Sequence, residues 1–200
     1  VNNKSAKQAR LDQDYGMAFQ QSGLFEWRTV AKNIELPLEL KGWDKAKRHE
    51  RALEMLELVK LSDFANHYPW QLSGGMQQRV AIARALAVHP SLLLMDEPFG
   101  ALDEMTREHM QSELLSICRA SGTTVVFVTH SIPEAVYLSN RVVVMSPRPG
   151  RVTEIVDVRI EGERNDATRD NSAFFKGITA VREALRGVEM SDHVRGIEDR

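Results

Sequence analysis

The sequence has little of three things, and each scarcity limits what the chain can be. It contains one cysteine, Cys118, so no disulfide can form within the chain, which fits a reducing cytosol. No apolar run approaches the roughly 20 residues that a helix needs to cross a bilayer, and the start shows no signal-peptide pattern. Neither sign of charge dominates, since 26 Lys and Arg face 28 Asp and Glu, which does not indicate a nucleic-acid binder. The composition is that of a globular cytosolic protein, and any membrane role would come through a partner.

What the chain does contain is an alternation of short apolar runs and helical segments. The runs at 92–95, 125–128 and 142–145 have the unbroken apolar pattern of strands buried on both faces. Helices are expected between them, at 104–120 and 133–138, with Gly122 as a natural C-terminal stop for the first. This order predicts an α/β fold with a parallel sheet. A further short strand is expected at 15–19.

The remaining segments give weaker signals. Residues 1–14 are polar and show little periodicity, and Pro37 should break or kink a helical pattern at 29–40. Asp44 is a good N-cap for a helix that reaches about Lys60. Residues 152–160 alternate like an antiparallel or edge strand. An amphipathic surface helix is expected at 173–186, followed by a frayed end.

The stretch 72–79, Leu-Ser-Gly-Gly-Met-Gln-Gln-Arg, predicts a helix start suited to an anion. Ser73 is a good N-cap, and Gly74 and Gly75 leave the first-turn amides open to close approach. Bare N–H groups at the positive end of a helix dipole favour phosphate. An ordinary capped helix would explain Ser-Gly-Gly equally well, so this stretch needs support from elsewhere in the chain.

Support comes from the polar residues that follow two of the apolar strands. Ligands bind beyond the carboxyl ends of strands in open α/β sheets, and there lie Asp96, Glu97 and His130. Asp96 can hold Mg²⁺ through a carboxylate, Glu97 can polarise a water, and His130 can contact a phosphate. Taken singly, the acids could be a helix cap and the histidine a structural residue.

Taken together, these segments occur in the order and spacing of an ABC-type ATPase, and the chain resembles the nucleotide-binding subunit of an ABC transporter. Gln20 matches the glutamine of the Q-loop, residues 72–77 the signature motif, and residues 92–96 the Walker B strand. Glu97 matches the catalytic glutamate, residues 101–103 (Ala-Leu-Asp) the D-loop, and His130 the switch histidine. The resemblance implies a P-loop NTPase-like fold, with a mostly parallel sheet and a helical subdomain at about 28–90 inside a partial ATPase domain at 1–160. Residues 161–200 would be a C-terminal extension.

The resemblance also implies a site shared by two such subunits, most simply a homodimer, with ATP between them. The nucleotide would contact Ser73, Gly74, Gly75, Gln77 and Asp103, while Asp96 and Gln20 help to coordinate Mg²⁺. Glu97 would orient the attacking water, and His130 would face the γ-phosphate.

The sequences of residues 23–30 and 146–151 resemble those of the importers for nitrate, sulfonate and taurine. Leu24, Phe25 and Trp27 lie where this family docks the membrane subunit, and aromatic residues are common interface anchors. The implied partners are transmembrane permease subunits and, indirectly, a periplasmic or extracellular solute-binding protein, with no nucleic acid. The implied place is the cytoplasmic face of the membrane, held peripherally.

One departure from the family pattern is large. No stretch matches the P-loop G-x-x-x-x-G-K-[ST], whose amides and lysine hold the β- and γ-phosphates, and only nineteen residues precede Gln20. We therefore expect an ABC subunit truncated at its N-terminus, which as it stands binds ATP poorly and does not turn it over. The alternative is a naturally short, non-catalytic subunit that only lends its signature motif to a partner's nucleotide site.

Rival functions share part of the pattern. A chromosome-maintenance or DNA-repair ATPase would need a long heptad insertion between Gln20 and Ser73, which is not there. A translation-type ABC protein would carry two cassettes and a charged linker, and an exporter usually fuses its membrane helices to the same chain.

Overall fold

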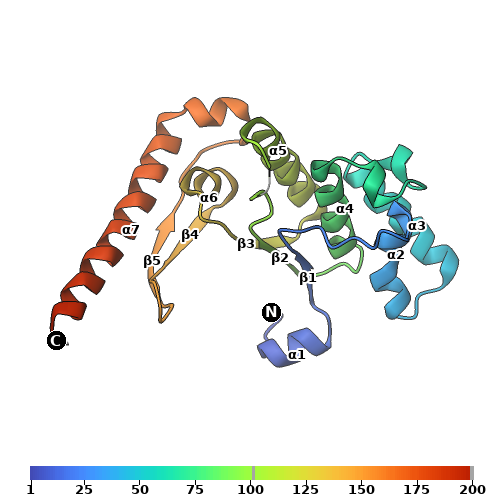
Figure 1. Ribbon diagram of the computed structural model, residues 1–200, viewed down its shortest axis with the longest axis horizontal. Helices are drawn as coiled ribbons and strands as arrows, with labels where there is room; N and C mark the ends of the chain where they lie inside the picture. The colour runs from blue at the N-terminus through green and yellow to red at the C-terminus, as the bar shows by residue number, and fades with distance from the viewer. Residues whose placement is uncertain (101, 199–200) are drawn as a thin grey trace. The chain divides into compact units, whose positions relative to one another are not determined.

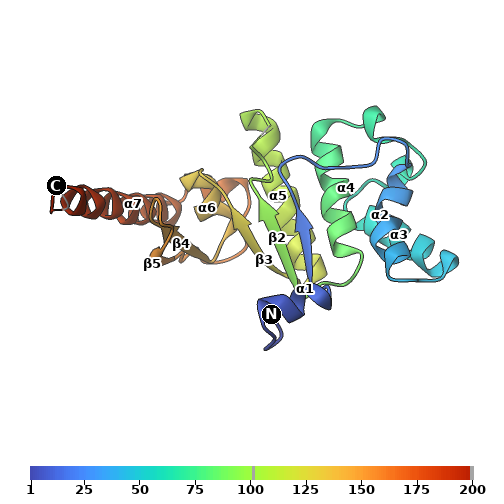
Figure 2. The same cartoon turned by 60° about the horizontal axis from the view of Figure 1, so that its bottom comes forward.

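The computed structural model describes residues 1–100 and 102–198. The chain divides into two compact units, Val1–Thr129 and His130–Arg200, and each is described here by itself. Figures 1 and 2 show the elements of both units. The domain division expected at residue 160 stays a prediction.

A three-stranded parallel sheet forms the centre of the first unit. Its strands are β1 (Tyr15–Ala18), β2 (Leu92–Asp96) and β3 (Thr124–Val128), in the order β1-β2-β3. Ala18 pairs with Met95 and Asp96 with Val128, so the carboxyl ends of all three strands meet at one edge. The sheet therefore presents the segments after β1 and β2 side by side, as expected for an α/β fold.

Helix α4 (Gly74–Leu86) is packed directly against β1. Gly16 makes this approach possible, because a Cβ at Gly16 would overlap the carbonyl oxygen of Ala85. Figure 2 shows α4 beside the sheet with helix α5 (Glu104–Ser121) next to it. A left-handed Gly122 ends α5, as the sequence predicts.

Helices α2 (Val30–Leu40) and α3 (Lys45–Leu58) pack on each other and on α4. The expected break at Pro37 is wrong: α2 continues past it, and Lys41 N–H still reaches the Pro37 carbonyl at 3.2 Å. Burial of the apolar stripe of α2 outweighs the hydrogen bond that proline removes. Asp44 caps α3, accepting from Ala46 N at 2.8 Å, which confirms that prediction.

Two short 3-10 turns, Ser62–Phe64 and Pro69–Gln71, lie between α3 and α4 in the chain. Arg79 ties α4 to the end of α3, because its Nη1 donates to the Val59 carbonyl at 3.0 Å. At the amino end, the polar segment 1–14 contains a short helix, α1 (Ala6–Leu11). Ser5 caps it, and Lys4 pairs with Asp12 and Asp14, so local polar bonds rather than an apolar stripe hold this helix.

The second unit contains α6 (Ile132–Leu138), β4 (Arg141–Met145), β5 (Val152–Asp157), a 3-10 turn (Asp166–Asp170) and α7 (Ser172–Glu198). Strand β4 was expected in the parallel sheet, which is wrong: it pairs with β5 in a separate antiparallel hairpin. The run of valines fits either partner, since an apolar pattern does not select its neighbour. Helix α7 packs along this hairpin (Figure 1) and extends beyond the expected end at 186.

Among the described residues, no helix is long and apolar enough to cross a membrane.

Candidate functional site

The helix start at Ser73 has the form that the sequence predicts. Ser73 Oγ accepts a hydrogen bond from Met76 N at 3.3 Å, and Gly74 and Gly75 form the first turn of α4. Neither amide has an acceptor within the helix; Gly74 is exposed, whereas Gly75 is buried. A Cβ on Gly75 would come within 3.2 Å of Met110 Sδ on α5, so this glycine also permits close packing of the two helices.

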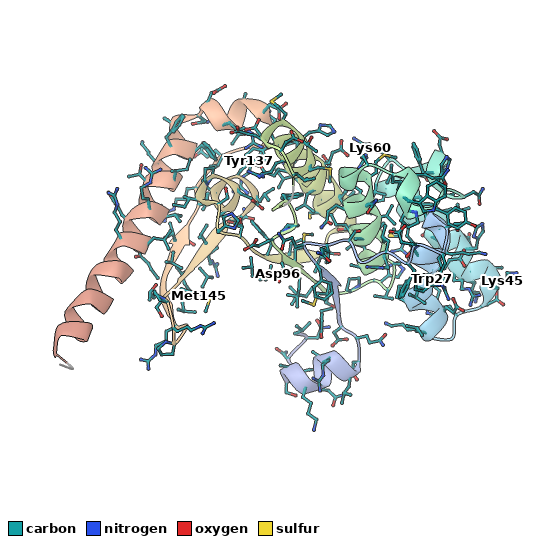
Figure 3. All side chains as sticks on the ribbon, viewed as in Figure 1. Trp27, Lys45, Lys60, Asp96, Tyr137 and Met145 are labelled. Carbon is teal, nitrogen blue, oxygen red and sulfur yellow. The ribbon has the colours of Figure 1, made fainter. Side chains whose placement is uncertain are left out.

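Polar side chains from β1 and β2 converge at the carboxyl edge of the sheet. Asp96 ends β2 and is exposed (Figure 3), and Glu97 follows with φ 41°, in the left-handed region that non-glycine residues seldom adopt. Its N–H donates to Val128 O at 3.0 Å, which holds this turn against β3. Such strained backbone is frequent at functional sites.

Gly100 shows how near Gln20 comes to Glu97. A Cβ on Gly100 would lie 2.9 Å from Gln20 Nε2 and 3.4 Å from Glu97 Oε2. The amide of Gln20 and the carboxylate of Glu97 therefore both lie next to Gly100, at a position that leaves no room for a larger side chain. The spacing of the sequence does not predict this role of Gly100.

The segment that follows Gly100 is fixed by α5. Of the matched D-loop, Ala101 lies outside the described residues. Asp103 is the N-cap of α5, accepting from Thr106 N at 3.0 Å, and these hydrogen bonds hold the pKa of its carboxyl below the usual value. Arg107 donates to Phe99 O at 3.4 Å and to Leu102 O at 2.7 Å. Sequence reasoning missed Arg107, because its acceptors are backbone carbonyls.

Gln77, expected at the nucleotide, uses its side-chain amide within the chain. Its Nε2 donates to Pro69 O at 2.9 Å and to Leu72 O at 3.4 Å, and its Oε1 accepts from Ser22 Oγ at 3.3 Å. A nucleotide contact by Gln77 stays a prediction. What the structure does show is a link between the signature helix and the segment after Gln20.

Residues 19–23, here called the Gln20 loop, have further bonds to α4. Gln78 Nε2 donates to Phe19 O at 3.2 Å, and the Arg84 guanidinium donates to Ser22 O and Gly23 O, both at 2.8 Å. Burial lowers the pKa of Arg84. Neither Gln78 nor Arg84 was singled out from the sequence, because their acceptors lie about sixty residues away.

His130 was expected beside these groups, at the end of the second apolar strand. It is the first residue of the second unit, two positions after β3 ends. Its predicted contact with a phosphate stays a prediction. The first unit therefore holds every other predicted site residue.

The three residues predicted to dock a membrane subunit follow the Gln20 loop. The rings of Phe25 and Trp27 pack at 5.0 Å between centroids, tilted by 59°, and Trp27 is 74% exposed (Figure 3). Leu24 is half-buried. Fully buried Asn33 on α2 holds this segment: it accepts from Phe25 N at 2.7 Å and donates to the carbonyls of Phe25, Arg28 and Thr29 at 3.0–3.1 Å.

A groove of about 430 Å³ opens beside this segment. Its walls come from β1, α2, α4 and the segments next to them, and they include Tyr15, Met17, Phe25, Leu36, Arg84 and Val88. Most of these side chains are apolar, but polar groups, among them the cation of Arg84, contribute nearly as much of the exposed lining. Such a groove suits an amphipathic segment of a partner.

The acidic residues fit magnesium bound together with phosphate. Within residues 1–100 and 102–198, no three His, Cys, Asp or Glu side chains gather closely enough to hold a metal ion. Mg²⁺ commonly takes one or two protein ligands and completes its shell with water and substrate phosphates. Exposed Asp96 fits that kind of site, and a metal contact by Gln20 stays a prediction.

A parallel sheet, a glycine-rich helix start and an Asp-Glu pair at the strand edge define a nucleotide-binding cassette. The family model "ABC transporter" matches residues 1–100. The chain belongs to the ABC transporter family, and the recognition made from the sequence motifs is confirmed.

Its relatives include named importers. The chain is 56% identical over 168 residues to an uncharacterized ABC transporter ATP-binding protein of Methanocaldococcus jannaschii, covering 84% of this chain and 63% of that protein. It is 52% identical over 157 residues to the taurine import ATP-binding protein TauB of Rhizobium johnstonii, covering 77% and 60%. The chain thus spans about three fifths of the length of these relatives.

Solved structures agree with the fold. The ATP-binding cassette MJ0796, in a dimeric post-hydrolysis state bound to ADP and Pi, is similar with a TM-score of 0.60 and 38% identity, covering 80% of this chain and 70% of that one. A second dimeric structure of MJ0796, described as a bacterial ABC transporter cassette, gives a TM-score of 0.62 and 39% identity. The predicted α/β cassette fold is therefore confirmed.

Proposed function

We propose that this chain is the ATP-binding and ATP-hydrolysing part of an ABC importer for a small solute of the nitrate, sulfonate or taurine kind. The observation that carries the proposal is its identity of about one half to taurine import ATP-binding proteins of two genera. Peripheral attachment at the cytoplasmic face, through a permease, follows from that role. A solute-binding protein would deliver the solute on the other side.

The nucleotide site would be built by two subunits, most simply two copies of this chain. The amides of Gly74 and Gly75, with Ser73, would bind phosphate of the nucleotide held on the opposite subunit, because a helix start attracts a polyanion. Gln77 and Asp103 would complete this side, Asp103 by fixing the start of α5.

Hydrolysis would use the groups at the sheet edge. Asp96 and Gln20 would hold Mg²⁺, which when bound would supply charge neutralisation during phosphoryl transfer. Glu97, placed beside Gln20 at Gly100, would orient the attacking water through its carboxylate. His130 would contact the γ-phosphate.

The permease would dock on Leu24, Phe25 and Trp27 and in the adjoining groove. The exposed ring of Trp27 and the apolar side chains of the groove support this placement. Aromatic anchors beside an apolar groove are frequent centres of binding energy.

The variant Glu97→Gln tests the catalytic assignment. It is expressed from its own gene and purified together with the permease that a neighbouring gene encodes. We expect ATP hydrolysis to fall at least a hundredfold while a fluorescent ATP analogue still binds, because the amide cannot polarise water. Glu104→Gln, one residue after the cap of α5, is the matched control. Unchanged hydrolysis in Glu97→Gln would contradict the assignment.

The importer role has its own test. Deletion of the gene should abolish growth on one of taurine, an alkanesulfonate or nitrate as sole source of sulfur or nitrogen, and the intact gene should restore it. Normal growth on all of them would reject the solute class.

We propose as a second candidate function that residues 1–200 lend their signature motif to a partner's nucleotide without hydrolysing ATP themselves, because no stretch among these residues matches the P-loop pattern. Purified alone, this chain should show weak ATP binding and no magnesium-dependent turnover. Robust turnover by the 200-residue chain would reject this candidate.

A further inference from the structure

Hydrogen bonds from helix α4 hold both ends of the Gln20 loop. Gln78 holds the carbonyl of Phe19 at 3.2 Å, and Arg84 holds the carbonyls of Ser22 and Gly23 at 2.8 Å. Gln78 and Arg84 are six residues apart on α4, about 9 Å along its axis. Between these points Gln20 and Gln21 are exposed. The loop therefore follows α4 while its centre stays open.

The fork at Arg84 has a geometry that few side chains can provide. Two successive carbonyls accept from its two Nη atoms, which suits the planar guanidinium and not the single ammonium of lysine. Gly23 has φ +52°, a conformation that L side chains rarely adopt. The backbone there is thus shaped to present both carbonyls to one arginine.

Arg84 and Gly23, one of its two acceptor residues, also line the groove, next to Phe25. A segment bound in the groove can therefore contact Arg84 directly. Arg84 is thus placed where its hydrogen bonds can respond to occupancy of the groove.

Helix α4 connects Arg84 with the amides of Gly74 and Gly75 in its first turn. Gly74 lies ten residues before Arg84, about 15 Å along the same helix. The close approach of Gly16 to Ala85 seats the far end of α4 on β1. One regular helix thus joins the groove wall to the signature motif.

We propose that Arg84 is the positioning residue that couples occupancy of the groove to the signature amides, through its fork on Ser22 and Gly23 and through helix α4. This inference rests on the proposed function, because the occupant of the groove is the permease. Coupling of this kind is reciprocal: docking changes nucleotide affinity by the factor by which nucleotide changes docking.

The test measures the factor by which the permease changes nucleotide affinity, in the protein as its gene encodes it. The dissociation constant of a fluorescent ATP analogue is determined with and without the permease, for the native protein, Arg84→Met and Arg84→Lys. We expect the native ratio in the range of about 5- to 150-fold that is typical of coupled sites. In Arg84→Met it should fall to within about twofold of one, and Arg84→Lys should be intermediate, because lysine can reach one carbonyl.

Arg79→Met is the matched control, because Arg79 lies on the same helix but holds the Val59 carbonyl of α3. A general loss of stability would lower affinity in both variants without changing the ratio in either. A native ratio in Arg84→Met, or an equal loss in Arg79→Met, would overturn the inference. If Arg84→Met does not fold, a native ratio in Arg84→Lys overturns it by itself. If the native protein binds no permease, the proposed function fails instead.

Discussion

At the scale of single residues, the most consequential side chain outside the predicted site is Asn33. It is fully buried, and its amide hydrogen-bonds to the backbone of Phe25, Arg28 and Thr29. A buried polar group that loses its partner costs free energy, so Asn33 and the backbone it bonds depend on each other. The backbone on either side of Trp27 is therefore held by a residue that is itself fully buried.

We therefore expect Asn33→Leu to lower the free energy of unfolding by about 2–3 kcal/mol, because backbone groups of residues 25–29 are left unsatisfied. Urea denaturation measures the loss. The amide of Phe25, which donates to Asn33 Oδ1, should exchange with deuterium faster. Gln21→Leu, at an exposed amide side chain of the same unit, is the control and should change stability little. Native exchange at Phe25 would contradict this role.

At the scale of elements, the contact of β1 with α4 decides where the signature helix lies. Gly16→Ala should destabilise the chain by about 1–3 kcal/mol, because its Cβ would overlap the backbone of Ala85, which cannot rotate away. Gly74→Ala is the control, since the nearest atom to its Cβ would be Leu102 Cδ2 at 3.9 Å. Equal unfolding midpoints for the two variants would show that the helix can shift without cost.

The start of α5 should respond to acid. Hydrogen bonds from Thr106 hold the folded-state pKa of Asp103 below its ordinary value of 3.8. A depressed carboxyl pKa contributes stability above the unfolded-state value, and this stability is lost as pH falls through the folded-state value. Thermal unfolding between neutral pH and acid should thus show a smaller loss for Asp103→Asn than for the native chain. A parallel pH dependence in both would contradict the prediction.

Several elements could be predicted from sequence because their signals are local. The caps Ser73 and Asp44 and the stop at Gly122 depend on residues within one helical turn, and all three are confirmed. The continuation of α2 through Pro37 and the pairing of β4 with β5 depend on packing partners that are distant in sequence.

The same distinction applies to the site. Residue types at the ends of β1 and β2 indicate where Gln20 and Glu97 belong, since strand ends in a parallel sheet share an edge. The bonds of Arg84, Arg107 and Asn33 end on backbone carbonyls, which are the same in every sequence. No residue pattern can reveal such acceptors before the fold is known.

At the scale of the whole chain, apolar strand residues remain exposed in both units. Val126 and Val128 of β3 are 52% and 59% exposed, and Val143 of β4 and Ile155 of β5 are 50% and 55% exposed. Val143 and Ile155 are cross-strand partners, so they form one patch on the hairpin. Exposed apolar strands favour edge-to-edge association.

The 200-residue chain alone should therefore self-associate, as seen by sedimentation velocity over a range of concentrations. Replacing Val143 and Ile155 by threonine should shift the distribution toward monomer, because threonine keeps the strand propensity and removes apolar surface. Thr153→Val, at a neighbouring strand position, is the control and should not improve solubility. A monomeric native chain at all concentrations would contradict this prediction.

The register of the central sheet has a consequence for how the chain is made. Tyr15 pairs with Leu92, so β1 leaves the ribosome about 75 residues before its partner strand. At usual synthesis rates of roughly 5–20 residues per second, the first strand waits several seconds for the second. Helices α2, α3 and α4 are synthesised in that interval and can form first, because their contacts are local. Translation speed over residues 19–92 therefore sets how long β1 is without its partner strand.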